Sequence, residues 1–211
     1  MTRADLICFS DRPPPPLFLS LCFIYLFSVG GLTGLVLGAA GTDIHVHDTH
    51  FVVSHFHFTM FGGTGFAFFA ALHYWWPKMF GRMYDFKRAY IASILVTGGF
   101  MFHYVPMFIL GMQGMPRRYY DYLPQYATGN FLAGFGALFI ILGIGLMVTN
   151  LLLSLRGERN APADPWGGVT LEWMTASPPP LHNFTAPPEI LAYPYDFSGV
   201  IKKFARKSKG V

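Results

Sequence analysis

Four long stretches without a charged side chain limit most strongly what this chain can fold into. No Asp, Glu, Lys or Arg occurs in residues 13–42, 49–77, 89–116 or 122–155. Each stretch can hold the roughly 20 apolar residues with which a helix crosses about 30 Å of hydrocarbon. A soluble protein could bury one such helix, but four would leave too little polar surface, since only 12% of all residues are charged. The sequence therefore predicts an all-α membrane protein.

The hydrophobic pattern divides the chain into three parts. Residues 1–16 form a short leader, residues 17–155 form the membrane segment, and residues 156–211 form a proline-rich, polar tail. We expect this tail to lie extended along the inner face of the membrane. Within the membrane segment we predict four transmembrane helices, at residues 17–40, 51–76, 89–110 and 131–155.

Basic residues orient these helices. The connection at residues 78–88 lies on the same side as both termini, and the opposite side is formed by residues 41–50 and 111–130. All of the 15 Lys and Arg residues except Arg117 and Arg118 fall on the first side. Because cytoplasmic or matrix segments carry the excess of basic residues, we expect both termini on that inner side. The two outer arginines then require a specific partner.

Three glycines give the first helix a nearly bare face. Gly30, Gly34 and Gly38 recur at intervals of four residues. Small residues at this spacing let two helices approach closely in lipid. We expect a second membrane chain to pack against this face.

The segment DIHVHDTHFVVSHFHF, residues 43–58, carries most of the chemistry. Its last two histidines, His55 and His57, fall inside the second predicted helix, where ionisable groups are costly and usually functional. At about 100° per residue, their side chains point roughly 200° apart, so they cannot bind one metal together. They can bind two centres on opposite sides of one helix, and imidazole is a common axial ligand of haem iron. Phe56 would lie between the two centres.

The outer side carries a second set of polar residues. His47 and Asp48 together suit a divalent cation whose remaining ligands are waters or groups of another subunit. The guanidinium groups of Arg117 and Arg118 suit carboxylates, such as the propionates of haem.

Two further histidines, His73 and His103, are single residues within predicted helices. We expect both to make structural hydrogen bonds inside the bundle.

These motifs resemble the last third of cytochrome c oxidase subunit I, a haem–copper oxidase. HDTHFVVSHFHF, preceded by VGGLTGLVL and followed by GMPRRYYDY and TLEWMTASPPPLHNF, stands in the family's order and spacing over about residues 17–184. The resemblance implies that the four helices form part of a twelve-helix bundle. It implies that His55, at the catalytic centre, is the proximal ligand of haem a3, and that His57 is one axial ligand of haem a.

The resemblance also assigns roles to the outer residues. His47 and Asp48 match the ligands of a magnesium (or manganese) ion that is not redox-active. Asp43, Arg117 and Arg118 match groups around the haem propionates. Reduction of oxygen to water with electrons from cytochrome c, coupled to proton pumping, is the activity that the resemblance implies.

Other chains are expected to complete this activity. The family's copper B ligands and the second ligand of haem a lie on earlier helices, so we expect a separate chain that supplies the N-terminal part of a split subunit I. Subunit II with copper A, further oxidase subunits and membrane lipid are the other expected partners, and no nucleic acid is expected. The expected location is the mitochondrial inner membrane, with the bacterial plasma membrane as the alternative.

Three alternatives stay open at this point. A quinol-oxidising haem–copper oxidase shares the His-x-His pair, but such enzymes typically change the Asp of the His-Asp-Thr motif, so Asp48 favours the cytochrome c branch. A membrane anchor with bis-histidine haem b needs two histidine pairs on facing helices, which His73 and His103 supply poorly. A transporter-like or purely structural bundle would contain no haem.

Overall fold

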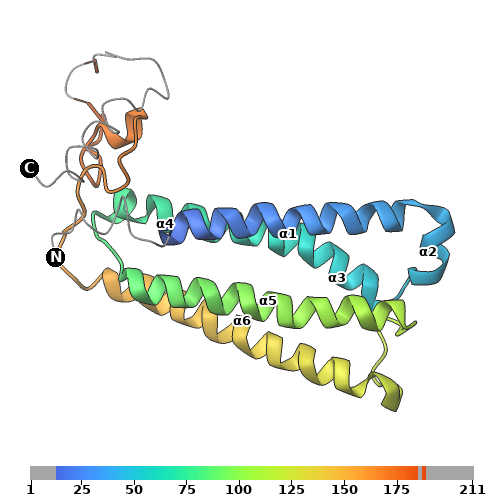
Figure 1. Ribbon diagram of the computed structural model, residues 1–211. Helices are drawn as coiled ribbons and strands as arrows, with labels where there is room; N and C mark the ends of the chain where they lie inside the picture. Colours follow the sequence, from blue (N-terminus) through green and yellow to red (C-terminus); the bar gives the residue numbers. More distant parts are fainter. Residues whose placement is uncertain (1–12, 185–186, 189–211) are drawn as a thin grey trace, which may run out of the picture.

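The fold is that of a computed structural model, which describes residues 13–184 and 187–188. The helical elements follow one another as α1 (Pro15–Gly38), α2 (Ala40–Val46), α3 (His50–Thr59), the π-helix η2 (Met60–Gly65), α4 (Phe66–Phe80), α5 (Phe86–Met112), the 3₁₀ helix η3 (Pro124–Tyr126), α6 (Ala127–Ser154) and the 3₁₀ helix η4 (Leu171–Trp173). An isolated antiparallel bridge joins Thr49 to Pro116. The expected all-α architecture is therefore present in the described part of the chain (Figure 1).

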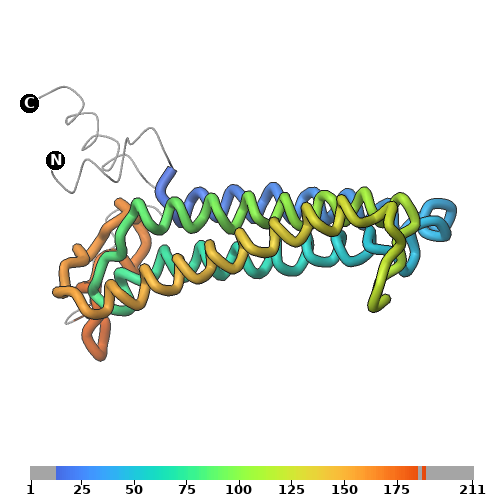
Figure 2. The backbone as a smooth tube through the Cα atoms, turned by 90° about the horizontal axis from the view of Figure 1, so that it is seen from below, coloured from blue at the N-terminus to red at the C-terminus, as the bar shows by residue number. Residues whose placement is uncertain are grey.

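The long helices run antiparallel along one common direction. In Figures 1 and 2, α1 runs from one end of the bundle to the other, α3 and α4 run back, α5 returns, and α6 runs back again. Helix α5 packs along α6 and against α3, while α1 packs against both α3 and α4. Both the start of α1 and the end of α6 therefore lie at the end of the bundle where α4 meets α5.

Within the described residues, three helices are long and apolar enough to cross a membrane, where the sequence predicts four. They are Pro15–Gly38, Phe86–Met112 and Pro124–Ser154. The second predicted span is helical from His50 to Phe80, but it consists of α3, η2 and α4, which have 10, 6 and 15 residues. The π-helical turn at Met60–Gly65 interrupts the α-helical hydrogen bonds, so neither α-helix reaches the length of a span.

Several predicted boundaries were wrong by a few residues. Helix α1 begins at Pro15, because proline is tolerated in a first turn whose N–H groups have no partner within the helix. The outer connection after α1 is mostly the short helix α2 rather than a loop. Helix α4 continues through Pro77 to Phe80, and Gly81 ends it in the left-handed conformation, with φ of 66°.

The glycine face of α1 packs inside this chain, which corrects one expectation. A Cβ atom on Gly30 would lie 2.7 Å from the Thr59 side chain, and one on Gly34 would lie 3.0 Å from the His55 ring. Only Gly38 of the three has open space around it within the described residues. The close approach that Gly30 and Gly34 allow is therefore between α1 and α3.

The first part of the tail folds onto the end of α4. Lys78, buried at 6% exposure, donates hydrogen bonds to the carbonyl oxygens of Ala163 and Thr175, each at 2.8 Å, and its Nζ lies 5.1 Å from the centre of the Trp173 ring. Trp173 also donates to the Tyr74 hydroxyl at 2.9 Å. Residues 163–175 thus cover one end of the bundle.

Candidate functional site

A short turn between α2 and α3 is held against the loop that follows α5. The backbone N–H of His50 donates to the carbonyl of Met115 at 3.0 Å, and that of Arg117 donates to the carbonyl of Asp48 at 2.9 Å. Asp48 has a φ of 55°, in the left-handed region that aspartate tolerates better than most residues. Backbone pairing therefore brings the predicted outer residues of both segments to one place.

Asp48 and Arg117 form an ion pair at this turn. Arg117 donates from Nε to Asp48 Oδ1 at 2.8 Å, and its Nη2 contacts the same oxygen. The hydrogen bond from Arg117 lowers the pKa of the Asp48 carboxyl below its ordinary value, so this exposed side chain stays anionic in mildly acidic solution. The neighbouring Arg118 is exposed and makes no ion pair within the described residues.

His47 lies between two carboxylates. Its Nδ1 is 3.4 Å from Asp43 Oδ2, and its Nε2 is 3.5 Å from Asp48 Oδ2. No group of three His, Cys, Asp or Glu side chains in the described part of the chain could hold a metal ion by itself. Two ligands of one octahedral Mg²⁺ ion are about 3 Å apart, because each bond is about 2.1 Å long. His47 Nε2 and Asp48 Oδ2, at 3.5 Å, are about 0.5 Å further apart than two such positions, so these exposed side chains would have to close slightly around an ion, and the other ligands would come from water or from elsewhere in an assembly.

His55 faces α1. Its Nδ1 lies 3.1 Å from the hydroxyl of Thr33. That hydroxyl donates its own hydrogen to the carbonyl groups of Gly30, at 2.9 Å, and Val29, at 3.1 Å. The hydroxyl carries one hydrogen, and while this hydrogen is bonded to either carbonyl the Thr33 oxygen accepts from His55 Nδ1, which leaves the lone pair of Nε2 free.

His57 faces α5. Its Nδ1 lies 2.8 Å from the carbonyl oxygen of Val53, which can only accept, so Nε2 again keeps its lone pair. The His57 imidazole stacks on the Tyr104 ring, with centroids 4.5 Å apart and planes inclined by 21°. The two histidines thus contact different helices, as the spacing of two residues predicts, and each presents an unprotonated nitrogen of the kind that haem iron binds.

Phe56 lies between the two histidines in sequence, and its ring centroid is 4.4 Å from that of His57. Sequence reasoning missed Thr33 and Tyr104, because each contacts its histidine from another helix. A polar residue within a mostly apolar helix was the one signal available for Thr33, and it shares this signal with Ser20 and Ser28.

His73 and His103 make structural hydrogen bonds, as predicted. His73 is fully buried, and its Nδ1 lies 2.8 Å from the carbonyl of Phe69. His103 Nδ1 lies 2.6 Å from the carbonyl of Ala133 on α6.

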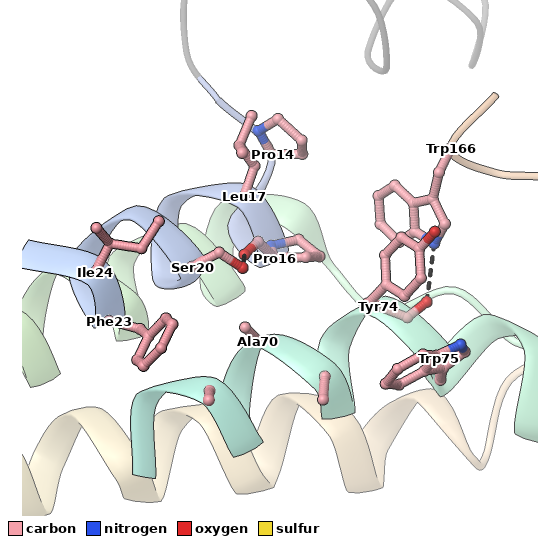
Figure 3. Close-up of a pocket in the computed structure, with 12 residues that line it drawn as sticks. Pro14, Pro16, Leu17, Ser20, Phe23, Ile24, Ala70, Tyr74, Trp75 and Trp166 are labelled. Atoms are coloured by element: carbon pink, nitrogen blue, oxygen red, sulfur yellow. Dashed lines mark hydrogen bonds between the residues drawn. The ribbon is translucent and has the colours of Figure 1, made fainter. Parts of the chain in front are cut away.

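A cavity of about 560 Å³ lies at the other end of the bundle, between α1, α4 and the tail (Figure 3). Its walls are mostly apolar and include Phe23, Ala70, Trp75 and Trp166. Trp166 donates to the backbone carbonyl of Tyr74 at 2.8 Å beside it. None of the predicted site residues lines this cavity.

Comparison with known proteins places this sequence in a family. The sequence model described as "Cytochrome C and Quinol oxidase polypeptide I" matches residues 10–149, which is more than half of the chain. The chain belongs to this family. The matched region includes both segments that carry the candidate site residues, which are residues 43–57 and 117–118.

Relatives and a solved structure agree with this membership. The chain is 41% identical over 172 residues to cytochrome c oxidase subunit 1 of Thermostichus vulcanus, and 42% identical over 176 residues to that of Bacillus sp. (strain PS3). Each alignment covers 82% of this chain, but only 31% and 29% of those proteins, so the chain spans about a third of their length.

The structure is also similar to a chain of a haem–copper terminal oxidase dimer solved by cryo-electron microscopy. The TM-score is 0.62 at 25% identity, and the similarity covers 68% of this chain and 27% of the other. Oxidases of this family are oxidoreductases that bind haem.

Proposed function

We propose that this chain supplies one axial ligand to each of two haems in the catalytic subunit of a cytochrome c oxidase. His55 would hold haem a3, the haem that would supply the oxygen chemistry, and His57 would hold haem a. The haems would supply the electron transfer and oxygen chemistry when bound. The chain's own residues hold, orient and separate them.

The divergence of His55 and His57 from one helix is the observation that carries this proposal. His55 is directed to α1 by Thr33, while His57 is directed to α5 by Tyr104. Each imidazole donates from Nδ1 to an acceptor, which fixes the tautomer that leaves Nε2 free for iron. Histidines with a purely structural role would not require two free Nε2 atoms that point in different directions from one helix.

The outer turn supports the assignment of the second metal. His47 and Asp48 would hold a magnesium or manganese ion, with Asp43 beside them. Arg117 already pairs with Asp48, so the cation would share that carboxylate with the guanidinium group. Arg118, which is exposed at the same turn, is the residue with a guanidinium group free to bind a haem propionate.

The other components of the site come from outside these 211 residues. The second ligand of haem a and the three histidines of copper B have no counterpart among the eight histidines of the sequence. We propose that further helices of subunit I complete the twelve-helix bundle, with α3, η2 and α4 crossing the membrane as one interrupted span. Subunit II with copper A would deliver electrons, and protons would be pumped outward across the membrane.

The location and the electron donor follow from the same reasoning. The excess of basic residues supports a topology with both termini on the inner side of the membrane. The named relatives come from bacteria, which supports the plasma membrane over the mitochondrial inner membrane. Asp48 favours cytochrome c over quinol as the donor, because quinol oxidases typically lack this carboxylate.

The experiment is an optical and kinetic study of the purified membrane assembly that contains this chain. The proposal predicts a reduced-minus-oxidised spectrum with haem a absorption, to the red of haem b, and oxygen consumption with reduced cytochrome c. Oxygen consumption with quinol alone would favour the quinol-oxidising branch. A haem b spectrum without oxygen consumption would favour an electron-transfer anchor. A preparation without haem would contradict the oxidase proposal and the anchor alternative.

A further inference from the structure

Tyr104 lies flat against one face of the His57 imidazole. The two ring centroids are 4.5 Å apart, and the ring planes are inclined by only 21°. Tyr104 is buried, with 9% of its surface exposed, whereas His57 is half-buried. The contact is therefore made by a side chain of the bundle interior. Tyr104 lies on α5, 47 residues after His57 in the sequence.

The structure holds Tyr104 in place from several directions. The hydroxyl of Ser54, which is fully buried on α3, donates to the Tyr104 carbonyl at 2.6 Å. This bond ties α5 to α3 one turn before His57. The Tyr104 ring also packs on Phe100, at 4.6 Å between centroids, and on the edge of His103, at 4.4 Å. Such packing leaves the ring little freedom to turn.

We propose that Tyr104 is a positioning residue that sets the plane of the His57 imidazole. The inference rests on the proposed role of His57 as an axial haem ligand. The hydrogen bond to the Val53 carbonyl fixes one edge of the imidazole, and Tyr104 fixes one face. Together they define both the tilt and the rotation of the ring, and the orientation of an axial ligand is one of the means by which a protein adjusts a haem.

The aromatic ring of Tyr104, rather than its hydroxyl group, makes this contact. Tyr104→Phe keeps the flat ring and should act as the matched control. Tyr104→Leu removes the flat ring, so that the imidazole can rotate about its bond to Cβ. Tyr104→Met fills the volume with a flexible chain that has no plane, and it serves where the leucine variant does not assemble.

The test is electron paramagnetic resonance of the oxidised, purified oxidase assembly, in which the g values of a low-spin haem depend on the orientation of its axial imidazole planes. We expect Tyr104→Phe to match the wild type, and Tyr104→Leu or Tyr104→Met to shift and broaden the low-field g signal at unchanged haem content. Unchanged g values in the leucine and methionine variants would overturn the positioning role. A low-spin signal that survives in His57→Ala would instead overturn the proposed function of His57, which separates the two failures.

Discussion

Replacing Gly111 by Ala should disturb the outer turn from a position that contains no functional group. Gly111 lies near the end of α5, where a Cβ atom would be 2.0 Å from the backbone nitrogen of Phe51 and 2.6 Å from its Cα. Ordinary contact begins at 3.4 Å, so α5 and the start of α3 must separate by at least 1.4 Å (3.4 minus 2.0). Backbone atoms cannot move aside as a flexible side chain can.

The cost of such overpacking is about 1–3 kcal/mol, which changes the equilibrium between folded and unfolded protein roughly 5- to 150-fold. The shift also pulls on the hydrogen bond from His50 to Met115, at 3.0 Å, which aligns the turn that holds Asp48. We therefore expect lower thermal stability together with weaker manganese binding.

The assay compares apparent unfolding temperatures of the purified assembly at one scan rate, and manganese content by paramagnetic resonance after growth on manganese. Gly98→Ala is the matched control, because Gly98 is on the same helix and a Cβ there meets nothing within 4 Å. If Gly111→Ala behaved as Gly98→Ala does in both measurements, the close approach of α5 to α3 would not be what aligns the outer turn.

Two further substitutions probe other contacts. Thr33→Val removes the acceptor of the His55 Nδ1 hydrogen bond, so the iron–histidine vibration of the high-spin haem should shift in resonance Raman spectra, and an unchanged frequency would show that Thr33 does not hold this ligand. Lys78→Met removes charged hydrogen bonds that each contribute roughly 1.5–3 kcal/mol, so hydrogen exchange in residues 163–175 should become at least about tenfold faster. Arg82→Gln, which removes one exposed hydrogen bond, is the control and should leave that exchange unchanged.

The sequence predicts helices well where the signal is a long run of apolar residues. The absence of charge located all four helical regions, because a membrane helix needs length and apolarity and little else. It could not show that the second region contains the π-helical turn at Met60–Gly65, since that turn depends on hydrogen bonds within the folded backbone. Nor could it show that Gly30 and Gly34 pack on α3, because small-residue spacing reports close approach and not the partner.

The candidate site shows the same division. The divergence of His55 and His57 follows from helical geometry alone, and the structure has it. Contacts between distant segments could not be predicted, because side-chain periodicity carries no information on them. Charge counting predicts that Asp48 and Arg117 lie on one side of the membrane. Their ion pair forms because backbone hydrogen bonds hold the two segments together, which the sequence does not show.

The central claim is that one helix supplies ligands to two different haems, and two single variants of the purified assembly test it most directly. His57→Ala should abolish the low-spin haem a signal while the high-spin haem remains, because the two imidazoles face different helices. His55→Ala should do the reverse, and either variant should stop turnover. Low-temperature optical and paramagnetic resonance spectra, with haem quantified per assembly, measure both signals. Loss of the same haem signal in both variants, or of neither, would contradict the account.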